Sequence, residues 1–255
     1  MVNAIDVPTI TPISRAEAYT LAVTEYVRLT DQLRSLAPDD WTKPTDCTLW
    51  DVRAVAGHCV GMLSDFTSLR TLFRRLSAAT RAAKAHGGQV IDSMTAMQVS
   101  DNAPLSIDEL ITRAEENGPR AAQWRTTAPG MLRAMPTKQE VDGQPETWRM
   151  GYLLDTILTR DPWMHRIDIA RATGRAMELT REHDGRIVAD VVAEWARRHG
   201  RPFTLGLTGP IGGTFVNGNG NGTAGEQVTI DAAEFCRILS GRAPGTGLLA
   251  QQVPF

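Results

Sequence analysis

The chain has 255 residues, 42% of them hydrophobic and 22% charged, with 27 basic and 29 acidic side chains that give a net charge of −2. Without a basic excess to neutralise phosphates, nucleic acid is not expected as the main partner. No apolar run approaches the roughly 18 residues that a membrane span needs, so a globular protein with one large domain, or a medium and a small one, is expected.

The N-terminus and the cysteines bear on the location of the protein. The first residues show neither the charged start nor the apolar core of a signal peptide. Three scattered cysteines, Cys47, Cys59 and Cys236, do not make a disulfide framework or a zinc-ribbon spacing. A reducing, cytoplasmic location is therefore expected.

The first part of the chain predicts an arm and a helix. Residues 1–13 contain two prolines and no periodicity, so they are expected to form an N-terminal arm. Ser14 and Glu17 then have the spacing of a capping box. Apolar residues at helical spacing follow until the break at Pro38, which predicts the first helix.

Two more helical patterns follow. The second starts at a box-like segment, residues 48–51, and runs on to the glycine pair at residues 87–88, with a break expected near Ser64. Ser106 and Glu109 open the third helix, and prolines at positions 129 and 136 mark the loop expected after it.

The fourth helical stretch, residues 147–173, contains a proline. Pro162 removes a backbone donor and disfavours helix in the residue before it, so a kink or two abutting helices are expected there. Gly174 ends the stretch, and a further helix is expected over residues 181–199.

The pattern changes after Gly200, where short alternating segments and a polar Asn/Gly loop at residues 217–222 replace the helical period. Strands are expected at residues 203–207, 213–216 and 227–230. Asp231 caps a final helix. The chain is therefore expected to be mainly α, with a four-helix bundle over residues 14–178 and a small α+β domain over residues 179–255.

Two histidines in strongly apolar helical segments, His58 and His165, are the candidates for chemistry. Asp161 lies four residues before His165 and Asp168 three residues after it, spacings that place side chains on one helix face. A carboxylate and an imidazole on that face can bind one divalent cation, and His58 can supply a third ligand from a neighbouring helix of the bundle. Three protein ligands leave one position open, which is the pattern of catalytic zinc.

Simpler interpretations of the same residues stay open. His58 can be a core histidine that one hydrogen bond satisfies, and Asp161 can be an N-cap before Pro162, since proline is favoured at the first helical position. Asp168 can accept a hydrogen bond from the ring of His165, or it can form a surface salt bridge with a nearby arginine.

Other polar candidates have ordinary explanations. Arg160 and Arg166 can hold an anionic substrate, but solvated surface positions explain them as well. Cys47 and Cys59 can be nucleophiles, yet no paired base is evident from the sequence, and buried thiols are usually inert.

Two segments resemble one protein family. The stretch from Trp41 to His58, with its Trp, Pro-Thr, Trp-Asp-Val and final histidine, resembles the first signature of the DinB-like, mycothiol-dependent maleylpyruvate isomerase family. Residues 159–170 resemble the acidic-x-x-x-His-x-x-Asp signature of the same family, and the C-terminal strands with residues 238–242 resemble its small C-terminal domain.

The resemblance implies a DinB-like bundle that binds a divalent metal, usually zinc, through His58, Asp161 and His165. It also implies mycothiol or a similar low-molecular-weight thiol as cofactor, used to conjugate or isomerise a small electrophilic substrate. The carboxylate of the family is usually Glu, so Asp161 can change the affinity for the metal or its identity. No catalytic or cofactor-binding residue is assigned.

Two alternative functions stay open beside the thiol enzyme. One is a non-catalytic metal-binding or stress-related DinB-like protein, and the other is a metal-dependent hydrolase. The expected partners are a small thiol and an electrophile, with neither nucleic acid nor a membrane, and the chain is expected to be a monomer or a homodimer.

Overall fold

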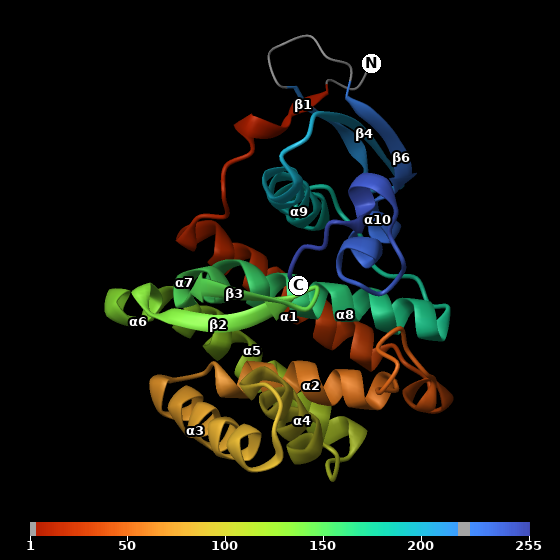
Figure 1. The fold of residues 1–255 in the computed structure, drawn as a ribbon. Coiled ribbons are helices and arrows are strands. Elements are labelled where there is room, and N and C mark those ends of the chain that lie inside the picture. Colours follow the sequence, from red (N-terminus) through yellow and green to blue (C-terminus); the bar gives the residue numbers. More distant parts are fainter. Residues whose placement is uncertain (1–3, 219–224) are drawn as a thin grey trace. The chain divides into compact units, whose positions relative to one another are not determined.

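The computed structural model describes residues 4–218 and 225–255, which form two compact units (Figure 1). The helical unit comprises residues 14–139 and 147–177. The α+β unit comprises the described residues of 1–13, 140–146 and 178–255. The expected division into an arm, a bundle and a C-terminal domain stays a prediction, and the structure adds residues 140–146 to the α+β unit.

The helical unit is built around four helices, α1 (Arg15–Arg34), α2 (Val52–Asp65), α5 (Ile107–Thr127) and α8 (Leu158–Thr173). Both α1 and α2 pack against α5 and against α8, which closes a bundle with a common apolar core. Two more helices, α3 (Leu69–His86) and α4 (Val90–Asn102), are added beside α2. The expected mainly α fold with a four-helix bundle is confirmed, whereas α4 was not predicted.

Capping residues set the starts of the bundle helices. Ser14 and Glu17 form the predicted capping box, in which the Glu17 N–H donates to Ser14 Oγ at 3.2 Å. The predicted box-like start at residues 48–51 would begin the helix at Thr48, and this prediction is wrong. The N-cap of α2 is Asp51, whose Oδ1 accepts a hydrogen bond from the Ala54 N–H at 2.8 Å, so the residues before it are a loop.

A hairpin replaces part of the expected loop and fourth helix. After the short α6 (Gly130–Ala134), strands β2 (Pro136–Val141) and β3 (Gln144–Arg149) pair around a tight turn. Asp142 and Gly143, the turn residues, have φ values of 52° and 69°, the backbone that makes Asp-Gly a strong hairpin pair. The helical stretch predicted from residue 147 therefore begins only at α7 (Met150–Tyr152).

Pro162 is accommodated inside α8 rather than at its start. A π-helical turn, Leu153–Ile157, precedes α8, and the proline cannot donate to the carbonyl of Leu158. That carbonyl instead accepts from Tyr26 Oη at 3.0 Å and from Arg125 Nη1 at 3.1 Å. The buried Arg125 also donates from Nε to the Leu154 carbonyl at 2.5 Å, so two helices supply the donors that the π turn and the proline remove.

The α+β unit has a four-stranded sheet in the order β1-β5-β4-β6. Its strands are β1 (Ile5–Asp6), β4 (Phe203–Thr208), β5 (Gly213–Asn217) and β6 (Glu226–Asp231). Strands β4 and β5 are antiparallel, whereas β6 is parallel to β4 and β1 is parallel to β5. The expected N-terminal arm thus contributes a short strand, and the Asn/Gly loop expected at residues 217–222 lies mainly outside the described residues.

Two helices, α9 (Asp184–His199) and α10 (Ala232–Leu239), complete this unit. Buried Trp195 on α9 lies 4.7 Å from Phe203 of β4 and 5.2 Å from Phe235 of α10, measured between ring centroids. The alternation predicted for β4 is confirmed, because Phe203, Leu205 and Leu207 are buried on one face.

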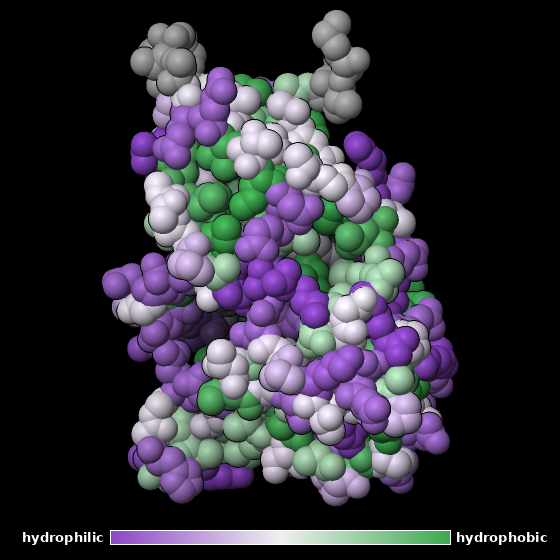
Figure 2. Space-filling view, turned by 90° about the vertical axis from the view of Figure 1, so that its right-hand side faces the viewer, coloured by the Kyte–Doolittle hydropathy of each residue, from purple (hydrophilic) through white to green (hydrophobic). Residues whose placement is uncertain are grey.

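The surface carries both polar and apolar side chains. Figure 2 shows hydrophilic and hydrophobic residues intermingled on the face in view. Individual exposed apolar residues are normal for a folded chain; the most exposed large ones include Leu49 and Met131. In the part of the chain that the structure describes, no helix has the length and apolar character needed to cross a membrane.

Candidate metal centre

The helical unit brings the candidate residues together by itself. His58 lies in the middle of α2, whereas Asp161, His165 and Asp168 follow one another on α8, the helix that packs against α2. Both histidines are buried, and the Asp161 side chain is the more accessible member of the group, with 22% of its surface exposed. The i, i+4 spacing places Asp161 and His165 on one face of α8, and the packing of α8 against α2 brings the Asp161 carboxylate opposite the His58 ring.

Both imidazoles turn the same ring nitrogen toward Asp161. His58 Nε2 lies 3.3 Å from Asp161 Oδ2, and His165 Nε2 lies 3.4 Å from Asp161 Oδ1. The ring centroids of the two histidines are 5.0 Å apart. One ligand atom from each of the three residues can be chosen so that all lie within 4.8 Å of one another.

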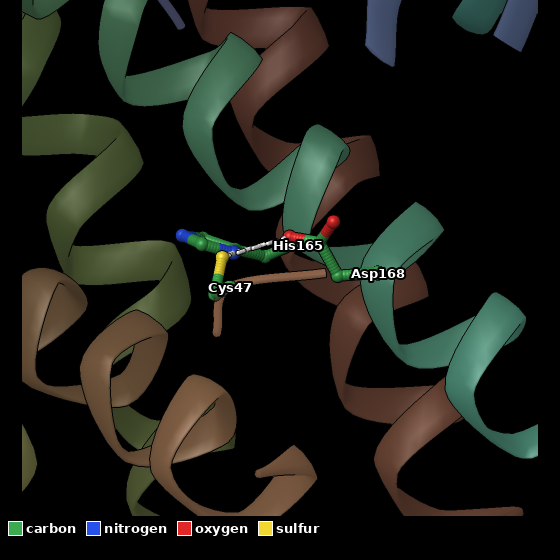
Figure 3. Close-up of side chains that lie close together, drawn as sticks. All are labelled: Cys47, His165 and Asp168. Carbon is green, nitrogen blue, oxygen red and sulfur yellow. Dashed lines mark hydrogen bonds and ion pairs between the residues drawn. The ribbon is translucent and has the colours of Figure 1, made fainter. Parts of the chain in front are cut away.

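A second set of contacts holds the other side of the His165 ring, as Figure 3 shows. Asp168 Oδ2 lies 2.9 Å from His165 Nδ1, and Asp168 is fully buried. Cys47, from the loop before α2, donates its S–H to Asp168 Oδ2 at 3.5 Å and has its sulfur 3.9 Å from His165 Nδ1. The carboxylate thus orients the ring, and the loop thiol contacts both.

The electrostatics follow from this packing. Burial tends to raise the pKa of Asp161, but the charges of His58 and His165 and hydrogen bonds with them outweigh burial and hold it below its ordinary value of 3.8. Burial tends to lower the pKa of His165, but Asp161 and the hydrogen bond with Asp168 outweigh it and raise this pKa well above 6.5. A cation that binds through His165 Nε2 must displace a proton, so its affinity should increase with pH.

The residues present fit a divalent metal by two observations. Two nitrogen or oxygen ligands held tetrahedrally at about 2.0–2.1 Å from zinc lie about 3.3–3.4 Å apart, which matches the distances from Asp161 to both histidines. The partly buried Asp161 and the fully buried Asp168 also carry a charge of −2 beside imidazoles that are neutral when they act as ligands, a charge that a divalent cation neutralises.

Several simpler interpretations are wrong. Asp161 is not an N-cap before Pro162, because α8 begins three residues earlier. Asp168 is fully buried, so it does not lie at the surface, and the two arginines considered as its partners form other pairs, Arg171 with Asp46 and Arg175 with Asp40.

Two of the arginines of α8, Arg160 and Arg166, are not solvated. Arg160 and Arg166 are each about 1% exposed, contrary to the surface positions expected for them. Arg166 Nη1 donates to Glu25 Oε2 of α1 at 2.9 Å. This buried pair joins two helices of the bundle, which gives Arg166 a structural role.

Sequence reasoning considered Cys47 and Trp50 but did not place either of them beside the two histidines. The loop turns back on itself, with the Trp50 N–H donating to the Cys47 carbonyl at 2.7 Å. Trp50 then lies 5.0 Å from His58 and 6.1 Å from His165 between ring centroids, so it lines the centre. Their place just before a helix that carries His58 was the available cue. Cys59, by contrast, is fully buried, and burial raises the pKa of its thiol.

The fold and the site together define a helical-bundle protein with a buried cluster of two histidines and a carboxylate. The family model of the mycothiol maleylpyruvate isomerase N-terminal domain matches residues 23–170, more than half of the chain. The chain therefore belongs to this family, which confirms the resemblance seen in the sequence and supports the expectation of an enzyme.

Solved structures show the same fold. The chain is similar to the crystal structure of the mycothiol-dependent maleylpyruvate isomerase, with 14% identity and a TM-score of 0.52. A histidine-to-alanine variant of that enzyme gives 15% identity and the same TM-score, and in both cases 91% of this chain and 92% of the other are covered. The search of curated proteins gave no match.

Proposed function

We propose that this protein is a metal-dependent thiol enzyme that uses mycothiol, or a closely similar low-molecular-weight thiol, to isomerise or conjugate a small electrophile. The observation that carries the proposal is the convergence of His58, Asp161 and His165, whose ligand atoms lie within 4.8 Å of one another. Family membership supports the use of a small thiol, because the matching family is that of the mycothiol maleylpyruvate isomerase N-terminal domain.

The side chains of the centre have separate roles in this proposal. His58, Asp161 and His165 hold a divalent metal, with zinc as the first candidate for a site of two nitrogens and one oxygen. Such a metal, when bound, would lower the pKa of a thiol that coordinates it, so that a nucleophilic thiolate would be available near neutral pH. Asp168 keeps the proton of His165 on Nδ1 and thereby leaves Nε2 as the ligand atom.

Trp50 and the partly exposed Asp161 side chain determine how a small thiol can reach the centre. The indole lies beside both imidazole rings, so it excludes water from one side of the cluster. Asp161 is the least buried of the three proposed ligands, so a small thiol is expected to approach from its side. The protein then contributes orientation, while the nucleophilic sulfur comes from the cofactor.

The test combines metal analysis with turnover. Purified protein should contain stoichiometric metal and should isomerise maleylpyruvate, the substrate in the name of the structural neighbour, only when mycothiol is added. His58→Ala and His165→Ala should each lose the metal and the turnover and keep the helical spectrum. His86→Ala, a change at an exposed histidine of α3, is the matched control and should keep both. Unchanged metal content in both ligand variants would refute the site.

The turnover assay, extended to other electrophiles, also distinguishes conjugation, isomerisation, hydrolysis and a non-catalytic role. A product that retains the thiol identifies conjugation, and an isomerised product with the thiol released identifies isomerisation. Turnover of an ester or amide that is independent of any added thiol would instead show a metal-dependent hydrolase. Bound metal without turnover across a panel of electrophiles would favour a non-catalytic metal-binding protein.

A further inference from the structure

The three cysteines of the chain lie in different environments. Cys59 in α2 and Cys236 in α10 have no exposed surface, whereas Cys47 is only partly buried and lies in the loop before α2. Reaction of a protein thiol with a dissolved disulfide requires access for both sulfurs. Cys47 is the least buried of the three cysteines, and it is therefore the candidate for such a reaction in the folded protein.

Cys47 also lies at the candidate metal centre. Its sulfur is 3.9 Å from His165 Nδ1 and 3.5 Å from Asp168 Oδ2, while the same imidazole presents Nε2 to Asp161. One ring thus separates the loop thiol from the cluster where the small thiol is proposed to bind. A compound shaped like that thiol and recognised there would come close to the Cys47 sulfur, which lies beside the His165 ring in Figure 3.

The loop that carries Cys47 has exposed residues and a fixed backbone. Thr48 and Leu49 follow Cys47 and are exposed, Leu49 to 93%. The backbone is nevertheless fixed, because the Cys47 N–H donates to Thr45 Oγ1 at 3.2 Å and its carbonyl accepts from the Trp50 N–H. The first atoms of an adduct on Cys47 would thus lie beside the His165 ring, and exposed loop residues follow directly in the chain.

From these observations we propose that Cys47 is a reversible thiolation site that switches the enzyme off when its own thiol cofactor is oxidised. The proposal rests on the proposed function, since that function supplies the small thiol. In the reaction, the Cys47 sulfur gives its proton to solvent and attacks one sulfur of the symmetric disulfide of the small thiol. The old S–S bond breaks, a new one forms to Cys47, and the other half leaves as a thiol after taking up a proton.

The expected consequence is loss of thiol-dependent turnover. The adduct occupies the space beside His165 and Asp168, and it removes the S–H donor that Asp168 accepts. Reduction by excess thiol reverses the same step and restores the original contacts. The ratio of reduced to oxidised cofactor would thus set the fraction of active enzyme.

The experiment uses the metal-loaded, full-length protein with mycothiol disulfide as the probe. Intact-mass measurement should show one added thiol half per chain, and peptide mapping should place it on Cys47. Turnover should fall by about tenfold or more and return after reduction. Cys47→Ser should gain no adduct, and its own turnover should not respond to the disulfide, whereas Cys236→Ala should behave like the wild type. Unfolded protein, in which all three thiols react, is the control for their reduced state.

The outcomes separate this inference from the proposed function. Active, metal-loaded enzyme that gains no adduct, or gains it on Cys59 or Cys236, overturns the thiolation site and leaves the function intact. An adduct on Cys47 with unchanged turnover also overturns the switch. An adduct confined to Cys47 in a protein without thiol-dependent turnover supports the thiolation site and counts against the proposed function. Because peptide mapping uses the wild-type chain, the result does not depend on the folding of a variant.

Discussion

Asp168 Oδ2 lies 2.9 Å from Nδ1 of His165, and the Asp168 side chain has no exposed surface. A buried carboxylate at this distance keeps a proton on Nδ1 of the imidazole, so the lone pair of the neutral ring is on Nε2. Nε2 is the atom that lies 3.4 Å from Asp161. The pair therefore selects which ring nitrogen is available to a metal.

Asp168→Asn tests this relationship with almost no change in shape. The amide is a weaker acceptor than the carboxylate, so the ring loses its fixed tautomer and metal affinity should fall by roughly 10–100-fold. The helical spectrum should be preserved. Competition with a metal chelator measures the affinity, and Asp92→Asn, at an exposed aspartate of α4, is the control that should leave it unchanged. Equal metal affinity in Asp168→Asn and Asp92→Asn would show that Asp168 does not contribute to metal binding.

Asp161→Glu addresses the departure from the usual carboxylate of the family. Asp161 lies inside α8 and already reaches both histidines at 3.3–3.4 Å, so it is not a helix cap. The longer side chain keeps the charge and the oxygen donors, and metal occupancy should be retained or raised. Asp161→Asn, which removes the charge, should lose most of the metal. The reverse order of metal content in these two variants would contradict a ligand role for this carboxylate.

Local patterns predicted much of the helical unit. The capping box at Ser14 and the bundle helices follow from short-range spacing, which depends on hydrogen bonds within one turn and on a single apolar face. The grouping of Asp161, His165 and Asp168 also follows from one helix, since residues three and four apart share a face. These features need no information from distant parts of the chain.

The missed features depend on tertiary contacts or on weak turn patterns. The β2–β3 hairpin was not predicted, because the strands on either side of its Asp142-Gly143 turn are polar and lack a strong alternation of apolar and polar residues. Pro162 predicted a break, but the donors of Tyr26 and Arg125 that satisfy the Leu158 carbonyl come from other helices. The approach of Cys47 to His165 likewise joins residues 118 apart in the sequence, so spacing could not show it.

Arg125 is expected to be a main support of the irregular start of α8. Its guanidinium donates to the carbonyls of Leu154 and Leu158 and to Thr159 Oγ1, all in the interior. Arg125→Met removes the guanidinium donor of the Leu154 carbonyl and of Thr159 Oγ1, whereas the Leu158 carbonyl keeps its hydrogen bond from Tyr26 Oη. Buried unsatisfied groups cost about 1–3 kcal/mol each, so a loss of about 2–4 kcal/mol is expected. Urea unfolding measures it. Arg120→Met, at an exposed position of α5, should change stability by less than about 0.5 kcal/mol.

His199 should make the α+β unit less stable in mild acid. Burial lowers the pKa of its imidazole below the ordinary 6.5; the ring centroid lies 4.4 Å from that of Trp195. The positive charge of nearby Arg201 lowers this pKa further. The unfolded chain then binds a proton more readily than the folded one as the pH falls through 6.5, so stability rises with pH in this window. His199→Phe should flatten the change in melting temperature between pH 7.5 and about pH 5. An identical slope in the variant would exclude His199, and His86→Phe at an exposed site is the control.

Gly61 is expected to stabilise the close contact between α2 and α4. A Cβ added there would lie 2.5 Å from Gln98 Cβ and 2.9 Å from Gln98 Cα, so the α4 backbone itself must move. Gln98 cannot simply rotate away, because its Nε2 donates to the buried Asp65 carboxylate at 2.8 Å. Overpacking of this kind costs about 1–3 kcal/mol.

The gain in helix propensity from Gly61→Ala is at most about 1 kcal/mol, so the clash should prevail and the variant should be less stable by up to about 2 kcal/mol. Gly130→Ala is the matched control, since a Cβ there meets nothing within 4 Å and the residue begins a helix. It should keep or slightly raise the free energy of unfolding. Urea unfolding followed by the helical signal compares the two, and a Gly61→Ala protein as stable as Gly130→Ala would show that α2 and α4 are less closely packed than these distances require.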